Sequence, residues 1–207
     1  IFKFDGGSIF LKNESKLELA YAFNLDEKYN YTTELLKKFM EDIDGYDLGM
    51  QDAIITYFFL NNIHSFLYDF QAIKNSAYIS DKDKKIIALN PNLRSRLFMP
   101  IRKNKIPIGM VSLISYEYCV NLSETDIKII EALCSFIGTA IENSKLYSLV
   151  ESQKAELEEK DRIISEDLFM AKRIQQNVIS NDYKKIKDLK FFIRYQPQSE
   201  IGGDIIL

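Results

Sequence analysis

The sequence predicts an α+β protein: an antiparallel sheet with flanking helices, then a long dimeric helix, then the first strands of another domain. Apolar segments of strand length, joined by short polar turns, occur before Tyr116. Segments with the apolar spacing of helices lie between them. From Glu124 to about Ile179 there is no proline and only one glycine, which predicts a helix of about 56 residues, or about 84 Å at 1.5 Å per residue.

Composition excludes several classes of protein. The chain has 207 residues, of which 46% are hydrophobic and 28% charged, as in soluble globular proteins. The chain has 27 Lys and Arg residues against 30 Asp and Glu residues, so it has no excess of positive charge. A nucleic-acid partner is therefore not expected. No apolar run approaches the roughly 18 residues of a membrane span. The two cysteines form no CxxC pair, so we expect a cytoplasmic protein without a disulfide framework or structural zinc.

The N-terminal half predicts a hairpin, two helices and a strand, in that order. Residues 8–23 contain two apolar segments around a polar turn. Residues 32–40 have helical spacing behind a threonine cap, and residues 51–60 predict a second helix. Residues 63–70 predict a strand, whereas the polar stretch 71–92 gives no clear pattern.

A second hairpin precedes the long helix. Residues 96–101 and 107–114 are apolar, and the turn Lys103-Asn104-Lys105 between them predicts antiparallel pairing. Ser123 stands three residues before Asp126, which resembles a capping box with Asp in place of Glu. The helix is therefore expected to begin near Glu124.

The long helix changes character along its length. One face of its first part is expected to pack on the sheet: Ile127, Ile130, Leu133, Cys134, Ile137 and Ile141. Farther on, apolar residues recur every seven positions: Val150, Leu157, Ile164, Ala171 and Val178. Polar Gln153, Lys160 and Asp167 share the partner heptad position with Leu146 and Ile174, which weakens the centre. We expect a homodimer through residues 124–179; a lone charged helix is the alternative.

Three short motifs lie within residues 94–147. They are Met99-Pro100-Ile101, Ile108-Gly109-Met110-Val111 and Ala140-Ile141-Glu142-Asn143. Their order resembles the C-terminal half of GAF domains, and the hairpin at 8–23 fits that family's first two strands. The resemblance implies a GAF-type sheet and a small-molecule sensor or dimerisation module.

The sequence does not name a ligand for this module, and it shows no cyclic-nucleotide or chromophore-attachment motif. Five aromatic residues are candidates to line an apolar pocket: Tyr46, Phe58, Phe59, Phe70 and Tyr78. Filling the core is the alternative role for the same residues. His64 is a further pocket candidate, although a lone histidine is more typical of a structural residue than of a haem or metal ligand.

A second set of motifs lies in residues 166–207. Ala171-Lys172-Arg173-Ile174-Gln175 precedes Tyr195-Gln196-Pro197, and Ile201-Gly202-Gly203-Asp204 follows. The order resembles the beginning of metal-dependent serine/threonine phosphatases of the stage II sporulation protein E class. The resemblance implies that Asp204 is the first ligand of a pair of Mn²⁺ or Mg²⁺ ions, which lower the pKa of an attacking water. Leu207 stands where that family often has a second acidic residue.

The two resemblances divide the chain into three parts. These are a GAF-like sensor domain at 1–147, a coiled-coil linker at 148–180 and the start of a phosphatase domain at 181–207. The GAF family's first helix would precede Ile1, and the other metal-binding carboxylates would follow Leu207. We therefore expect a piece of a longer bacterial signalling phosphatase, inactive alone and without a catalytic residue of its own, whose parent dephosphorylates phosphoserine or phosphothreonine on a regulatory protein.

Three alternative functions make different demands on the sequence. A non-enzymatic GAF module for ligand binding and dimerisation stays open, and the presence of further aspartates downstream would tell the two apart. A sensor piece of a histidine kinase would need a phosphoacceptor in the long helix, whereas His64 is the sole histidine. A diguanylate cyclase is rejected because Ile205-Ile206 follows Gly-Gly-Asp where that family continues Glu-Phe.

Overall fold

The computed structural model describes residues 3–50, 52–76 and 79–178. The chain divides into two compact units, residues 1–143 and residues 144–207. The first unit contains the described strands and three helices, and a fourth helix begins in it. The strands predicted around the Tyr-x-Pro and Gly-Gly-Asp motifs lie outside the described residues.

The elements follow the predicted order. The described strands are β1 (Gly6–Asn13), β2 (Lys16–Asn24), β3 (Tyr46–Asp47), β4 (Ser65–Leu67), β5 (Ser95–Lys103) and β6 (Ile106–Ser115). The described α-helices are α1 (Asn30–Ile43), α2 (Ile54–Leu60), α3 (Asp81–Leu89) and α4 (Glu124–Val178). The short strand β3 and helix α3 were not predicted, since neither is long enough to show a periodic pattern.

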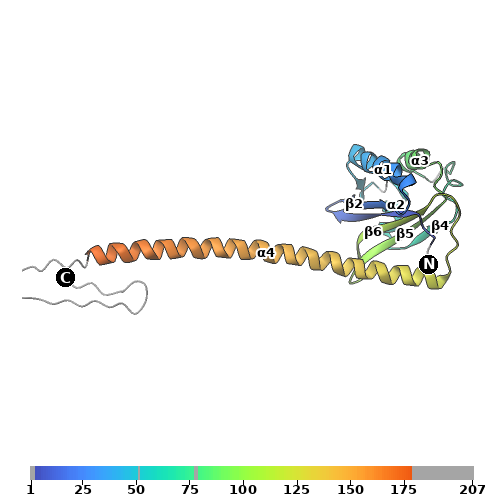
Figure 1. Ribbon diagram of the computed structural model, residues 1–207. Helices are drawn as coiled ribbons and strands as arrows, with labels where there is room; N and C mark the ends of the chain where they lie inside the picture. Colours follow the sequence, from blue (N-terminus) through green and yellow to red (C-terminus); the bar gives the residue numbers. More distant parts are fainter. Residues whose placement is uncertain (1–2, 51, 77–78, 179–207) are drawn as a thin grey trace, which may run out of the picture. The chain divides into compact units, whose positions relative to one another are not determined.

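All six strands belong to one sheet, in the order β3-β2-β1-β6-β5-β4. Every neighbouring pair is antiparallel, and both predicted hairpins, β1–β2 and β5–β6, are present. Strands β1 and β6, far apart in the sequence, lie side by side at the centre (Figure 1). The predicted α+β class with an antiparallel sheet is therefore confirmed.

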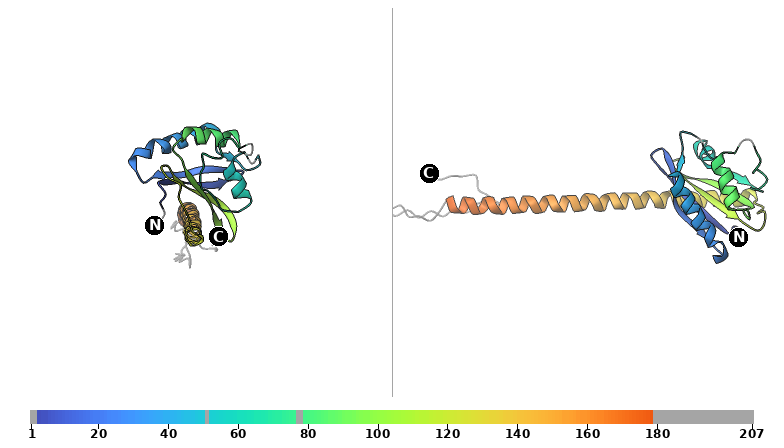
Figure 2. Two further views of the ribbon diagram at one scale, coloured as in Figure 1. Left: turned by 90° about the vertical axis from the view of Figure 1, so that its right-hand side faces the viewer. Right: turned by 90° about the horizontal axis from the view of Figure 1, so that it is seen from above.

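Helices α1, α2 and α3 cover one face of the sheet, and the first part of α4 covers the other (Figure 1 and Figure 2). Successive side chains of a strand point to opposite faces, and β5 illustrates this. Its Leu97 and Met99 join the cluster with α4, whereas Phe98 joins the cluster with α1 and α2. Arg96, in register with Phe98, therefore faces the side of α1 to α3.

Helix α4 packs closely on β5. A Cβ atom added at Gly138 would lie 2.5 Å from the carbonyl oxygen of Arg102, so only glycine fits this approach. Ile130 and Cys134 are buried against the sheet, as predicted. The placement of Leu133 on that face was wrong, because its side chain is 50% exposed.

Two helices begin with a serine–aspartate capping box. At α4, the Ser123 amide donates to Asp126 Oδ2 at 2.9 Å and the Asp126 amide donates to Ser123 Oγ at 3.2 Å, as predicted. At α3, Ser80 and Asp83 make the same exchange. Asp83 Oδ2 also accepts a hydrogen bond from the amide of Ile54 at 2.9 Å, so one carboxylate caps both α2 and α3.

Helix α4 has 55 residues, close to the predicted length. Its second part, from Ser144, carries ion pairs along its surface, including Lys160 with Glu156 and Arg162 with Glu166. Such pairs support an exposed helix only weakly. Within the described ranges, no helix has the length and hydrophobicity that crossing a membrane would require.

Candidate functional site

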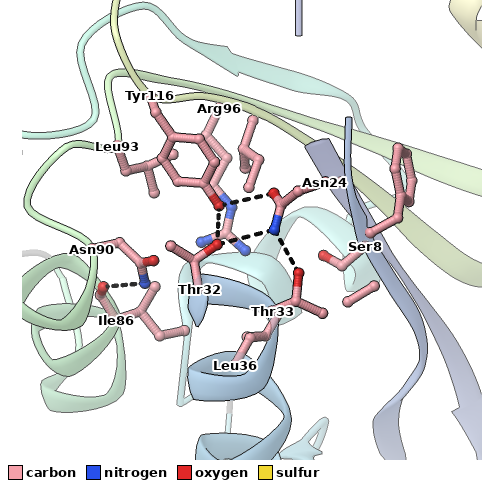
Figure 3. Close-up of a pocket in the computed structure, with 14 residues that line it drawn as sticks. Ser8, Asn24, Thr32, Thr33, Leu36, Ile86, Asn90, Leu93, Arg96 and Tyr116 are labelled. Carbon is pink, nitrogen blue, oxygen red and sulfur yellow. Dashed lines mark hydrogen bonds between the residues drawn. The ribbon is translucent and has the colours of Figure 1, made fainter. Parts of the chain in front are cut away.

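A small cavity lies between the sheet and helices α1 and α3 (Figure 3). Its volume is about 30 Å³, enough for one or two small groups such as water molecules. The walls come from β1, β2, α1, α3, β5 and β6. The lining residues labelled in the figure are Ser8, Asn24, Thr32, Thr33, Leu36, Ile86, Asn90, Leu93, Arg96 and Tyr116.

Arg96 supplies the charge in this cavity. Its side chain is only 4% exposed, and its Nε donates a hydrogen bond to Ser112 Oγ at 2.8 Å on the neighbouring strand. The guanidinium carbon lies 4.5 Å from the ring centre of Phe98 and 5.3 Å from that of Phe70. The strand register and these two rings hold the guanidinium at the cavity, where it faces the polar groups of β2 and α1 (Figure 3).

A hydrogen-bond network forms the polar wall opposite. Asn24 Nδ2 lies 2.6 Å from Thr33 Oγ1 and 3.2 Å from Thr32 Oγ1 (Figure 3). Thr32 Oγ1 lies 2.6 Å from the Tyr116 hydroxyl, and that hydroxyl lies 3.2 Å from Asn24 Oδ1. Thr32 also donates to the backbone carbonyl of Tyr29 at 2.7 Å. Two hydroxyl groups therefore stand at the edge of the cavity, and the network uses the proton of each.

Burial shifts the acidity of both ionisable groups at the cavity. It raises the pKa of Tyr116 to about 12, so the phenol is neutral near pH 7 and keeps its proton to donate. Burial lowers the pKa of Arg96, and the nearby Tyr46, Asp83 and Tyr116 partly oppose this shift. A guanidinium nevertheless stays protonated in proteins, so the cavity carries a positive charge.

The predicted pocket aromatics lie elsewhere in the fold. Tyr46, Phe59 and Phe70 are buried in the core, and Phe58 packs against it. None of these four lines the cavity, although Phe70 supports Arg96 from the side. The same is true of His64, whose side chain is exposed. Tyr78 lies outside the described residues.

The residues that line the cavity were not predicted from the sequence. One signal was available for Arg96, because it is in phase with Phe98 on a strand that otherwise reads apolar. No local signal marks Asn24, Thr32 or Tyr116, since they come from three separate segments that only the folded sheet brings together.

Metal binding in the described part of the chain depends on clustered ligand side chains, and the reactivity of its buried thiol follows from its pKa. The described residues contain no group of three or more His, Cys, Asp or Glu side chains that could hold a metal. Asp204 lies outside them. Burial raises the pKa of Cys134 to about 12, which leaves almost no reactive thiolate near neutral pH.

Comparison with solved structures identifies the fold as that of GAF domains. The GAF domain/HD domain protein of Geobacter sulfurreducens superposes with a TM-score of 0.54 at 15% identity, over 70% of this chain and 84% of that one. The GAF domain region of a putative membrane protein of the same species has a TM-score of 0.50 at 20% identity, over 68% and 83%.

The GAF domain of a two-component sensor histidine kinase from Bacillus halodurans also has a TM-score of 0.50, at 18% identity, over 72% of this chain and 88% of that one. No protein-family model matches the sequence, and no curated protein matches it. Identities this low establish the fold alone.

Proposed function

We propose that the chain is the sensory portion of a bacterial signalling phosphatase. Residues 1–143 bind a small molecule, α4 pairs with a second copy, and the following segment begins a phosphatase domain that acts on phosphoserine or phosphothreonine. The observation that carries the sensory part is the cavity between the sheet and α1 and α3, where a buried arginine and two hydroxyls converge.

The cavity supports ligand binding because a buried guanidinium and several polar side chains border the same space. Protein interiors are close-packed, and a buried charge without an ionic partner is rare in them. Here Arg96 and Tyr116 both border the same space, from β5 and from just after β6. A ligand reaching them would contact α1 and α3 as well, so its binding would alter how those helices sit on the sheet.

Pairing through α4 is supported by large apolar side chains on its surface. In the first unit, Ile129 and Phe136 are 44% and 72% exposed. In the second, Val150, Leu157 and Ile164 are between 55% and 60% exposed. These five residues are spaced at multiples of seven, the repeat of a two-stranded coiled coil. A second copy of the same helix would cover them.

A matched pair of variants tests the dimer. We expect Leu157→Glu to convert the protein from dimer to monomer in sedimentation equilibrium, because it places a charge at the centre of the apolar repeat. Glu158→Gln, at the neighbouring exposed position, should leave the dimer intact. Wild-type protein that sediments as a monomer would refute pairing.

The phosphatase part depends on the motif resemblance that ends at Asp204. In the full-length parent protein, we expect Mn²⁺-dependent release of phosphate from a phosphoserine protein, and loss of that release in Asp204→Asn. Asp188→Asn, an acidic position outside the Gly-Gly-Asp motif, is the control that should retain activity.

The second candidate, a non-enzymatic module for ligand binding and dimerisation, is favoured by the same cavity and the same helix surface. The phosphatase experiment separates the two. Absence of metal-dependent phosphate release from several phosphoproteins would contradict the enzyme and leave the module. Release that Asp204→Asn abolishes would refute the module as the whole function.

A further inference from the structure

Arg96 differs from Lys82 and Arg102, two partly buried cations, in having no carboxylate partner among the described residues. Lys82 forms an ion pair with Asp52, and Arg102 forms one with Glu131 at 2.7 Å. Across residues 3–50, 52–76 and 79–178, no carboxylate pairs with Arg96, although its side chain is the most deeply buried of the three. Buried charges are normally paired, so this position is exceptional.

Asp83 is an acidic residue whose charge acts on Arg96, but its carboxylate is hydrogen-bonded to other groups. Its Oδ2 accepts hydrogen bonds from Ser80 Oγ at 2.8 Å and from the amide of Ile54 at 2.9 Å. Asp83 favours the charged form of Arg96, but burial opposes it more strongly. The charge of Arg96 is therefore not balanced by a contact within this part of the fold.

The geometry of the guanidinium shows which of its atoms are available. Nε is used by Ser112, and the rings of Phe98 and Phe70 lie near the guanidinium carbon. The remaining N–H groups form the planar fork that binds the two oxygens of a carboxylate side by side. They border a cavity that also receives the hydroxyls of Thr32 and Tyr116.

We propose that Arg96 binds the carboxylate of a small organic acid in this cavity through its two terminal nitrogens, beside the hydroxyls of Thr32 and Tyr116. The inference rests on the proposed sensory function and names the chemical class of its ligand. The cavity volume of about 30 Å³ fits a carboxylate group, whereas the rest of a larger acid would have to displace Leu36 or Ile86 from the apolar wall. One guanidinium balances one negative charge, which disfavours a doubly charged phosphate.

The test measures thermal unfolding of the 207-residue protein in increasing sodium acetate and sodium propionate, at constant ionic strength set with sodium chloride. We expect both carboxylates to raise the unfolding temperature in a concentration-dependent way, as a ligand of the folded state does. Inorganic phosphate and chloride at the same ionic strength should have a smaller effect.

Variants then assign the response to the cavity. Arg96→Met should weaken carboxylate binding by about 10- to 100-fold, the usual effect of losing a hydrogen-bonded charge. Arg96→Lys, which keeps the charge but lacks the fork, and Thr32→Val should each weaken it less. Arg102→Gln, at an arginine outside the cavity, should keep the wild-type response.

Two outcomes would overturn the inference: no carboxylate raises the unfolding temperature, or Arg96→Met, Arg96→Lys and Thr32→Val all respond like the wild type. If neutral acetamide stabilises the wild type and Arg96→Met alike, the carboxylate assignment is wrong while a ligand-binding function stands. If acetate binds through Arg96 but changes no activity of the full-length parent, the assignment stands and the sensory function fails.

Discussion

The two faces of the sheet bury different kinds of side chain. Toward α4 lies an apolar cluster that includes Leu97, Met99 and Cys134. Toward α1, α2 and α3 lie the buried charged groups of the described residues, Asp83 and Arg96, together with a cavity. The same strand, β5, contributes to both faces. One face therefore packs closely on α4, whereas the other has looser packing and more polar contacts.

Leu97→Ala should produce the largest effect, because Leu97 is fully buried on the α4 face. Removing its side chain leaves a void that the close-packed cluster cannot fill. We expect the free energy of unfolding to fall by about 3 kcal/mol, measured by urea denaturation. Leu25→Ala, at a position that is 74% exposed and lies outside α4, is the control and should lower the free energy of unfolding by well under half as much. Equal losses would contradict the packing argument.

Gly138→Ala should be destabilising even though alanine is the better helix former. The new methyl group would meet the carbonyl oxygen of Arg102 at 2.5 Å, which forces α4 away from β5. We expect a loss of about 2 kcal/mol in urea denaturation, against a helix-propensity gain of about 1 kcal/mol. Thr139→Ala, at the exposed neighbouring position, serves as the matched control. A more stable Gly138→Ala would show that α4 does not pack as described.

On the other face of the sheet, Arg96→Met should raise the free energy of unfolding rather than lower it. It replaces an unpaired buried charge with an apolar side chain of similar length, so we expect the ligand-free protein to gain about 1 kcal/mol of stability. Urea denaturation in chloride buffer without carboxylates gives the measurement. A loss of more than 1 kcal/mol would mean that the fold itself balances the charge of Arg96.

The burial of Cys134 on the α4 face makes the stability of the protein depend on pH. Burial raises the pKa of its thiol from about 9 to about 12, so the folded state holds the proton more tightly than the unfolded chain. The stability this provides is complete below about pH 9 and is lost as the pH rises toward 12. Between pH 8 and pH 10, the free energy of unfolding should fall by about 1 kcal/mol less in Cys134→Val than in the wild type. Parallel pH profiles for the two proteins would contradict the burial of the thiol.

Much of the frame could be predicted from the sequence. Both hairpins and the Ser123–Asp126 cap were predicted, because alternation, turns and caps are encoded within a few neighbouring residues. Helix α3 was missed, since its nine residues begin with the charge run around Asp83 and show little amphipathic spacing. Leu133 was assigned to the wrong face because the exposed apolar residues of α4 lie beside the buried ones.

The candidate site was much less accessible to sequence reasoning. Its hydrogen bonds join Asn24, Thr32 and Tyr116 across large separations along the chain. The aromatic residues chosen from the sequence fill the core because large apolar side chains serve packing and ligand pockets alike. A polar residue in phase with a buried strand, such as Arg96, was the more informative signal.

The double role of Asp83 has a mechanical consequence. A single carboxylate oxygen holds the first turn of α3, through Ser80, and the first turn of α2, through Ile54. Lifting α3 from the sheet would therefore strip a hydrogen-bond acceptor from α2 at the same moment. Asp83 therefore couples the positions of α2 and α3. A displacement of α3 at the cavity wall would move both helices.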